Sequence, residues 1–432
     1  MQKEYGMANK KLRILWFTNT AANADEYFNS ELKGTGGWLK SLDQELQHHL
    51  DLNIAFYHST ESKAFQFGKT KYYPIFKRKR NLFQKYKYLK TGQVHYDTDI
   101  DKYLSIIDNV QPDLIHIHGT EINFGCLVEH VNIPVVISIQ GILTVVHHKY
   151  FKDIGKKFLK QRAPGILGTL GYRPFWDSYV KMGVRKKQEQ RTLASCKHII
   201  GRTDWDKNVI TVLTNNANYY HSNEILRSQF YLTKWAPHKN EKKIIWTTTV
   251  ATYYKGFETL FQAVQLLNSN LDIDFEWRVA GIDSADAIVR IIKKQAKQKG
   301  AIKQLKLLGK LSEKELIKGM LESDIYVTAS HIENSPNGLC EAMLLGMPCI
   351  ATHAGGTNTI ITDKKDGILI QDGDPWSLAG AIINLLTDEE KMNKLSINAY
   401  KTAQKRHDKK SIVNNLLDTY NYILQDNIKT TL

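Results

Sequence analysis

Two carboxylates, Glu333 and Glu341, stand eight residues apart in a stretch that is otherwise mostly apolar, small or turn-forming. The stretch covers residues 331–356 and reads HIENSPNGLCEAMLLGMPCIATHAGG. A buried carboxylate without a partner is costly, so Glu341 needs hydrogen-bond donors. A ligand diol could supply two of them. A loop N–H or a buried arginine is the purely structural alternative.

A helix is expected to follow the first of these carboxylates. Residues 324–330 read as a strand, after which Ser335 is a favoured N-cap and Pro336 suits the first helical position. Gly346 ends the run. Free N–H groups at such a helix N-terminus, facing a cleft, can hold an anion or the oxygens of a sugar. These groups belong to Asn337, Gly338 and Leu339.

One lysine follows the strand expected at residues 242–250. The sequence VATYYKGFETL ends that strand near Val250 and starts a helix near Gly256, which leaves Lys255 beyond the strand end. A lysine there can neutralise a diphosphate as a point charge. A solvated surface lysine is the alternative.

Glycines precede the helix expected from residue 38. Gly34, Gly36 and Gly37 follow the loop after the first strand, where they would expose backbone N–H groups to a phosphate. A flexible loop would have the same composition and is the alternative.

Two histidines alternate along the strand expected at residues 112–119. His116 and His118 therefore share one face of it. They could suggest a metal pair, but no third ligand or carboxylate cluster accompanies them, which favours core or cleft histidines. His118 is nearer the strand end and is the better cleft candidate. No metal site is predicted.

The elements that must position these residues alternate between strand and helix in two series. Such alternation predicts parallel sheets covered on both faces, here an α/β fold with two Rossmann-like domains facing each other across a cleft. The expected strands are 12–18, 52–58, 112–119, 133–141 and 196–203 in the first series, then 242–250, 274–281, one within 302–311, 324–330, 349–354 and 367–373.

The second series starts near residue 242, after a polar segment with a proline at 231–242. We expect a first domain over residues 1–235 and a second over residues 236–407. A final helix at about 408–426, within residues 408–432, could belong to either half and could cross back to the first. Ligands of parallel sheets bind beyond the carboxyl ends of the strands, so the cleft is the expected site.

Composition limits the partners. The 432 residues include 59 Lys+Arg against 44 Asp+Glu, a formal charge of +15, so the partner should be negatively charged. The four cysteines form no CxxC pair, which favours a reduced cytoplasmic protein. The N-terminal apolar run is too short for a signal peptide. No stretch approaches the ~18 apolar residues of a spanning helix, so any membrane contact should be peripheral.

Basic residues concentrate in three segments of the first half. Residues 76–90 contain seven Lys/Arg, no acid, and interleaved Phe, Leu and Tyr, and residues 147–162 and 184–191 are the other two segments. Cations with interspersed aromatics suit an anionic lipid surface, here the inner face of the cell membrane. A plain solvated surface is the alternative. Nucleic acid is not predicted as a partner, because no recognisable nucleic-acid module accompanies the charge.

Together these motifs resemble those of retaining GT-B glycosyltransferases, the large group called family 4 or glycosyl transferases group 1. The resemblance covers most of the chain and is stronger in its C-terminal half. It rests on the E-x7-E pair with the run EAMLLGMPCIATHAGG, the Gly-Gly loop, the strand PDLIHIHG, the YYKG segment, and LGKLSEKEL followed by SDIYVTAS.

The resemblance implies a GT-B fold and a retaining sugar transfer. The donor would be a nucleotide sugar, with UDP- or GDP-sugars expected. The acceptor would be a glycan or a lipid-linked oligosaccharide in surface polysaccharide synthesis, such as lipopolysaccharide or capsule. No cofactor and no metal would be required.

The resemblance also implies individual roles. Glu341 would accept hydrogen bonds from the nucleotide ribose, Glu333 would contact hydroxyls of the donor sugar, and Lys255 would bind the diphosphate and stabilise the leaving group. The remaining donor-binding residues would be Gly36, Gly37, Asn337, Gly338 and Leu339.

Three positions depart from the family pattern. An arginine usual in the family is replaced by Val250, and Arg202, just past a strand end of the first domain, is the expected substitute. Gln140 stands where many members have a histidine that touches the donor sugar, which it could contact through its amide. Thr359 stands where many members have a glutamate. These changes weaken the assignment of the donor sugar rather than of the class.

Two other functions stay open. One is a GT-B sugar-nucleotide epimerase or phosphorylase. The E-x7-E pair and Lys255 argue against the epimerase, and the phosphorylase lacks support because no lysine has a recognisable pyridoxal-phosphate context. The other is a catalytically degenerate protein that binds a nucleotide sugar or a partner without turnover, which the substitutions at Val250 and Gln140 keep open.

Overall fold

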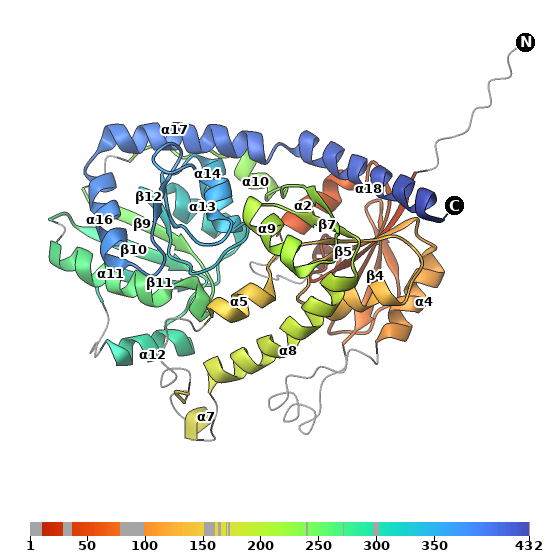
Figure 1. Cartoon of the computed structure of the whole chain (residues 1–432). Helices are drawn as coiled ribbons and strands as arrows, with labels where there is room; N and C mark the ends of the chain where they lie inside the picture. The colour runs from red at the N-terminus through yellow and green to blue at the C-terminus, as the bar shows by residue number, and fades with distance from the viewer. Residues whose placement is uncertain are drawn as a thin grey trace, which may run out of the picture.

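A computed structural model describes most of the chain and contains two sheets, which lie on opposite sides of Figure 1. Gly34, Gly36, most of the basic segment 76–90 and residues 151–159 fall outside the described residues. The described residues are 11–28, 37–77, 99–150, 160–162, 166–169, 171, 173–238, 241–270, 272–296 and 302–431.

The first sheet contains eight strands within the described part of the chain, in the order β3-β4-β2-β1-β5-β6-β7-β8. The β3–β4 pair is antiparallel and the other pairs are parallel. Its apolar central strands are buried on both faces, as a parallel sheet between helices requires. The strands are β1 (Arg13–Thr18), β2 (Asp51–His58), β3 (Phe65–Phe67), β4 (Thr70–Phe76), β5 (Leu114–His118), β6 (Val135–Ser138), β7 (His198–Gly201) and β8 (Asn218–His221).

The second sheet is parallel throughout its six described strands, in the order β11-β10-β9-β12-β13-β14. β9 and β12 are neighbours at its centre, so their carboxyl ends open on the same edge. The strands are β9 (Lys243–Thr248), β10 (Phe275–Ala280), β11 (Leu305–Gly309), β12 (Ile325–Thr328), β13 (Cys349–Thr352) and β14 (Ile368–Ile370).

These sheets confirm the predicted α/β fold with two Rossmann-like domains. The strands β3, β4 and β8, toward the two edges of the first sheet, were not predicted. None of the described helices is long and apolar enough to cross a membrane.

Helices cover both sheets. Those of the first half are α1 (Ala24–Tyr27), α2 (Gly37–Leu46), α4 (Ile100–Val110), the 3-10 helix η1 (Asn123–Glu129), α5 (Leu143–Lys149), α7 (Ile166–Thr169), α8 (Pro174–Ser195), α9 (Asp204–Leu213) and α10 (Ser228–Tyr231). Those of the second half are η2 (Tyr253–Lys255), α11 (Phe257–Asn270), α12 (Ala287–Gln295), α13 (Glu313–Leu321), α14 (Asn337–Leu345), α15 (Thr357–Ile360), α16 (Pro375–Leu386), α17 (Glu389–Arg406) and α18 (Lys409–Thr431).

Apolar packing joins the two halves at α5 and α8. Tyr150, just after α5, and Phe175 of α8 belong to the same buried cluster as Tyr253 and Phe257 of the second half. Figure 1 shows α5 lying between the two sheets. The two sheets are therefore held together by helices of the first half that pack on the second.

The last helix, α18, packs on the first sheet. α17 and α18 follow each other along one side of both halves (Figure 1). Tyr420 of α18 is fully buried, and its hydroxyl meets the Trp16 indole N–H at 3.2 Å and His116 Nδ1 at 2.7 Å. Residues 231–238 of the expected linker contact the second half, because the buried Trp235 donates its indole N–H to the Ser323 carbonyl at 2.7 Å. The exact domain boundaries stay a prediction.

Candidate functional site

Lys255 and Glu333 meet at the carboxyl edge of the second sheet. Lys255 ends η2, after β9, and Glu333 follows β12. The lysine Nζ lies 2.6 Å from Oε1 of Glu333, and their side chains are only 20% and 11% exposed. The Ser330 hydroxyl donates to the same carboxylate oxygen at 2.7 Å. The two residues predicted to handle the diphosphate and the donor sugar therefore form one part-buried ion pair.

The charge of Lys255 is secured by this pairing. Burial alone would lower the pKa of Lys255, but the charge and hydrogen bond of Glu333, together with Tyr254, outweigh that effect and the net shift is upward. The site thus holds a permanent cation whose ammonium has further N–H donors for an anionic ligand.

Glu341 is paired with an arginine that the sequence did not single out. It lies in α14, is 4% exposed, and accepts hydrogen bonds from Nε and Nη2 of Arg227, each at 2.7 Å. Burial raises the pKa of Glu341, and the attraction of Arg227 offsets only part of that rise. From the sequence, a buried arginine was one structural alternative for Glu341, and Arg227 is such an arginine. The contact of Glu341 with a ribose stays a prediction.

The N-terminus of α14 differs in detail from the prediction. The helix begins at Asn337, with Pro336 as an extended N-cap, and Ser335 instead donates its hydroxyl to Glu224 at 2.6 Å. The N–H of Leu339 donates to the Pro336 carbonyl at 3.0 Å. Three N–H groups were predicted to be free, those of Asn337, Gly338 and Leu339. Of these, the N–H groups of Asn337 and Gly338 have no acceptor among the described residues.

Close packing explains the glycine at position 338. A Cβ on Gly338 would lie 2.6 Å from the hydroxyl of Tyr326 and 3.2 Å from Thr248. These neighbours belong to β12 and β9, so the missing side chain lets α14 approach the strand ends that carry the site. A larger residue would push the helix, and Glu341 with it, away from the sheet.

Arg202 lies at the junction of the two halves. Its residue is 5% exposed, its guanidinium sits 4.2 Å from the centre of the Trp38 ring, and its Nε is 3.7 Å from Oε2 of Glu224. The next residue, Thr203, donates its hydroxyl to Oδ1 of Asn334 at 2.7 Å. Arg202 thus stands near the Glu333 loop, but its role as the substitute phosphate cation stays a prediction.

Glu224 is a second residue that sequence reasoning missed, after Arg227. Burial alone would raise the pKa of Glu224, but Arg202, with His407 and Arg406, lowers it to about 2. Together with Cys340 and His407, Glu224 forms a group of possible metal ligands within 4.8 Å of one another. Because the two arginines already balance the carboxylate, an additional cation would be repelled, and an ion-pair network explains the group better.

The two histidines of β5 are core residues. His116 bonds to the hydroxyls of Tyr420 at 2.7 Å and Ser138 at 2.6 Å, and burial lowers its pKa to about 3. His118 is 1% exposed and packs against Trp16, with ring centres 4.5 Å apart. Neither ring nitrogen of His118 has a hydrogen-bond partner among the described residues. The structure places the proposed cleft histidine in the core.

Gln140 reaches the Glu333 loop through its backbone. Its carbonyl accepts a hydrogen bond from the Asn334 amide at 3.2 Å, while its own side-chain Nε2 is buried without a partner among the described residues. Beside it, Glu121 accepts hydrogen bonds from the Asn19 amide at 2.8 Å and from the N–H of Gly141 at 3.3 Å. The first sheet therefore presents an amide and a carboxylate near this junction.

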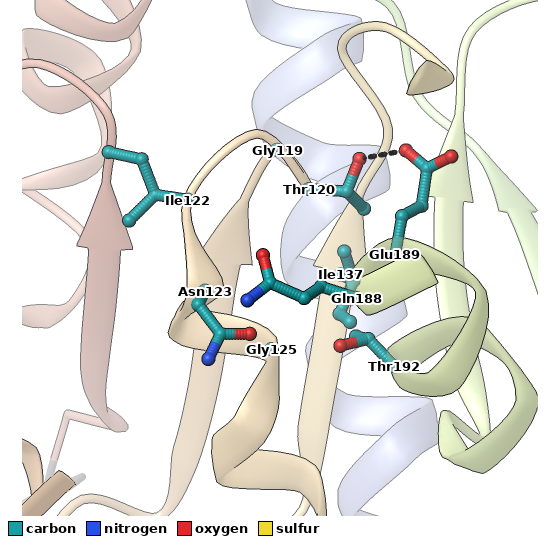
Figure 2. A pocket seen from close by; sticks show the side chains of 9 residues that line it. All are labelled: Gly119, Thr120, Ile122, Asn123, Gly125, Ile137, Gln188, Glu189 and Thr192. Carbon is teal, nitrogen blue, oxygen red and sulfur yellow. Dashed lines mark hydrogen bonds between the residues drawn. The ribbon is translucent and has the colours of Figure 1, made fainter. Parts of the chain in front are cut away.

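Glu189 holds two loops of the first sheet in place. Its buried carboxylate accepts hydrogen bonds from the Thr120 hydroxyl at 2.6 Å and from the N–H groups of Leu143 and Thr144 at 2.9 and 2.7 Å. Figure 2 shows Thr120 and Glu189 beside a cavity of about 10 Å³, which has room for about one water molecule. This cavity is too small for a donor sugar. Glu189 gave no signal in the sequence, where it appears as one acid in a basic helix.

His331 links the site to both halves. Its two ring nitrogens lie 2.5 Å from Asp372 and 2.5 Å from Glu258, and Lys149 of α5 lies 3.2 Å from the other oxygen of Asp372. Burial alone would lower the pKa of His331, but the two carboxylates raise it to about 10. A protonated histidine two residues before Glu333 is therefore part of an ion-pair chain between the second sheet's loops and α5.

The segment that carries this site, and the fold as a whole, are similar to known proteins. Residues 233–402, which include Lys255, Glu333 and Glu341, match the family described as "Glycosyl transferases group 1". Among solved structures, sucrose-phosphate synthase from Thermosynechococcus elongatus aligns over 96% of this chain and 100% of its own with a TM-score of 0.73 at 14% identity. The Anabaena protein HepE in complex with UDP-glucose aligns over 95% of this chain and 99% of its own with a TM-score of 0.63, also at 14% identity.

The fold is thus that of the GT-B proteins, and residues 233–402 are similar to glycosyl transferases group 1, as predicted. Two curated relatives match shorter segments. UDP-Gal:alpha-D-GlcNAc-diphosphoundecaprenol alpha-1,3-galactosyltransferase of Escherichia coli is 34% identical over 76 residues, 18% of this chain and 19% of that protein. N-acetyl-alpha-D-glucosaminyl L-malate synthase of Bacillus anthracis is 32% identical over 104 residues, 24% of this chain and 27% of that protein.

Proposed function

We propose that this chain is a retaining glycosyltransferase that moves a sugar from a nucleotide sugar to a glycan or lipid-linked oligosaccharide in surface polysaccharide synthesis. The observation that carries the proposal is the Lys255–Glu333 pair, 2.6 Å apart beyond two adjacent strand ends, inside the segment that matches glycosyl transferases group 1. A fixed cation beside a fixed carboxylate suits a ligand in which a diphosphate adjoins a sugar.

The donor is proposed to be a UDP-sugar, with a GDP-sugar as the alternative. Support comes from the structural neighbour HepE, whose complex contains UDP-glucose, and from the relative named for UDP-Gal. In this chain Glu341 would accept hydrogen bonds from the ribose, Lys255 would bind the diphosphate, and Glu333 would accept from hydroxyls of the sugar. Gly37 and the free N–H groups of Asn337 and Gly338 would complete the donor site.

The proposed chemistry asks little of the protein beyond position and charge. The acceptor oxygen bonds to the anomeric carbon as the bond from that carbon to the diphosphate breaks, and both events occur on the same face of the sugar. The electron pair passes to the phosphate oxygen, which also receives the proton of the acceptor hydroxyl. Lys255 stabilises the charge that grows on this oxygen, and Glu333 fixes the sugar ring.

We further propose that the reaction needs no resident metal ion, because Lys255, together with Arg202 as the proposed substitute cation, would supply the positive charge that a metal would supply to the leaving diphosphate. Treatment with a chelator should leave turnover unchanged. Loss of activity that Mg²⁺ or Mn²⁺ restores would contradict this part.

The acceptor is proposed to be lipid-linked, with the protein bound peripherally at the cytoplasmic face of the membrane. The basic segments of the first half support this, including Lys186, Lys187 and Arg191 in α8, as does the relative named for a diphosphoundecaprenol acceptor. Flotation with anionic vesicles at low salt tests membrane binding, and neutral vesicles are the control. Failure to float with the anionic vesicles would contradict the proposed membrane contact, but it would leave the proposed transfer reaction standing.

The decisive experiment is a thermal-shift screen against UDP-, GDP- and ADP-sugars, followed by a turnover assay with the best binder. A ligand that binds the folded state raises its melting temperature. We expect stabilisation by one nucleotide class and release of the nucleoside diphosphate when a glycan acceptor is present. Conversion of the donor to an epimer would support the epimerase instead, and binding without turnover on any acceptor would support a degenerate protein.

A further inference from the structure

Arg227 is the least expected residue of the site. It precedes α10, in the segment that leads from the first half to the second, and its partner Glu341 lies 114 residues further along the chain. Neither the motif pattern nor the departures from it pointed to this arginine. Its position beside the proposed ribose carboxylate raises the question of what else it binds.

Two contacts position the Arg227 side chain, one at its stem and one at its guanidinium. Its Cγ and Cδ pass so close to Gly37, the first residue of α2, that a Cβ on that glycine would lie 2.5 Å from each. The centre of the Phe230 ring lies 4.8 Å from its Cζ. The guanidinium is therefore held between the start of α2 in the first half and Glu341 in the second.

The Arg227 guanidinium has N–H donors that Glu341 does not use. Nε and Nη2 are used by Glu341, whereas Nη1 has no hydrogen-bond partner among the described residues. The side chain is 15% exposed, so it is not sealed from a ligand. Burial alone would lower the pKa of Arg227, but Glu341 and more weakly Glu313 raise it, so the group stays charged. A planar guanidinium with free N–H groups is well suited to phosphate oxygens.

We propose that Arg227 binds the phosphates of the nucleotide donor through Nη1 while Nε and Nη2 hold Glu341 against the ribose. This inference rests on the proposed function. The 5′ phosphate is joined to the same ribose ring whose diol Glu341 would bind, so a cation bonded to Glu341 lies within about one ribose of the phosphates. Val250 provides no positive charge, and the ammonium of Lys255 is shared with Glu333. Arg227 would add a further positive charge, beside the one proposed for Arg202, from the first-half side of the site.

The competing explanation is that Arg227 only orients Glu341 and never touches phosphate. Uridine and UDP separate the two explanations, because both carry the ribose diol and only UDP carries phosphate. An arginine that binds phosphate contributes more to UDP than to uridine. An arginine that acts through Glu341 contributes equally to both.

The test compares wild type, Arg227→Met and Arg227→Lys by calorimetric titration with UDP and, in competition, with uridine. If the wild type prefers guanine, GDP and guanosine replace them. Loss of a charge-assisted hydrogen bond costs about 10- to 100-fold in affinity. We expect the UDP affinity of Arg227→Met to fall by that factor relative to the wild type. The loss of uridine affinity should be smaller than the loss of UDP affinity by a factor of about ten or more. Equal losses for UDP and uridine, or no loss for either, would overturn the proposal.

Arg278→Met is the matched control. Arg278 of β10 is also ion-paired, with Glu276 at 2.7 Å and Glu322 at 3.2 Å, but it has no part in the proposed site. Its UDP affinity should equal that of the wild type. If Arg227→Met does not fold because Glu341 loses its partner, Arg227→Lys decides the question. It keeps the charge but cannot hold Glu341 and a phosphate together, so its preference for UDP over uridine should fall about 5- to 10-fold. An unchanged preference would overturn the proposal.

Failure of this inference is distinct from failure of the proposed function. If the wild type binds no nucleoside diphosphate, the proposed function fails. If the wild type binds UDP and the Arg227 variants bind it equally well, only the inference fails.

Discussion

The ammonium of Lys255 and the carboxylate of Glu333 lie 2.6 Å apart, although the two residues are separated by 78 positions in the chain. The contact forms because β9 and β12 are neighbours in the second sheet and each residue follows the carboxyl end of its strand. A second lysine–acid pair, Lys243 and Asp324, joins the opposite ends of the same two strands at 3.5 Å. Two similar ion pairs thus mark the two ends of one strand pair, and only one stands where ligands bind.

Lys255→Met should abolish most turnover. The lysine stabilises charge on the leaving diphosphate, and removal of one such group typically costs about 100- to 1000-fold in kcat. Lys255→Arg should retain part of the activity because the charge remains. The measurement is release of the nucleoside diphosphate at saturating donor.

Lys243→Met is the control for that experiment. It breaks the comparable pair at the amino ends of the strands, so it should lower the melting temperature and leave kcat within about threefold of the wild type. Wild-type turnover by Lys255→Met, or an equal loss in both variants, would refute the role of Lys255.

Arg202→Ala should lower turnover at least about tenfold if Arg202 takes part in binding the diphosphate, as expected for the loss of a charged hydrogen bond. It also removes the main charge that keeps Glu224 ionised, so the melting temperature should fall. Steady-state kinetics at a temperature where the variant is folded separate the two effects. Wild-type turnover in a folded Arg202→Ala variant would contradict the assignment of Arg202 as a diphosphate-binding cation.

His331 should make stability depend on pH on the alkaline side. Its pKa in the folded protein is about 10, above the ordinary value of 6.5, so protonation of His331 stabilises the fold fully below pH 6.5 and loses that effect as the pH rises toward 10. His331→Gln should lower the melting temperature on the order of 5 °C at pH 7 and by progressively less toward pH 10. The measurement is a series of melting curves between pH 6 and 10.

The exposed His130 provides the control, because within the described part of the chain its ring bonds to the Cys126 carbonyl of its own helical turn and to no carboxylate. His130→Gln should follow the wild-type curve throughout. If the difference in melting temperature between His331→Gln and the wild type is the same at every pH from 6 to 10, protonation of His331 adds no stability.

The sequence predicts those parts of the fold that depend on local pattern. The runs LRILWFT and DIYVTAS become the buried strands β1 and β12 because continuous apolar residues suit a sheet that helices cover on both faces. The pairing of β9 with β12, which the local pattern does not predict, then brings Lys255 to Glu333. Ser312 caps α13 with a full capping box, again as the local sequence predicts.

Pairings between distant segments could not be predicted in the same way. Arg227 and Glu341 carry no local sign that they meet, and the same is true of Glu189 and the loops that it holds. His331 also carries no local sign of its partners, because Asp372 and Glu258 are brought to either side of it by β14 and α11. The start of α14 was misplaced by one residue because Glu224, far away in the chain, takes the hydroxyl of Ser335.

The central claim is that the two acids of the E-x7-E pair have different partners, Glu341 the nucleotide and Glu333 the sugar. The most direct measurement is UDP affinity by calorimetry, together with turnover, for Glu341→Ala and Glu333→Ala. Glu341→Ala should weaken UDP binding about tenfold or more, whereas Glu333→Ala should bind UDP within about threefold of the wild type and lose about 100-fold in turnover. Negligible effects of both variants on donor binding and turnover would contradict the account.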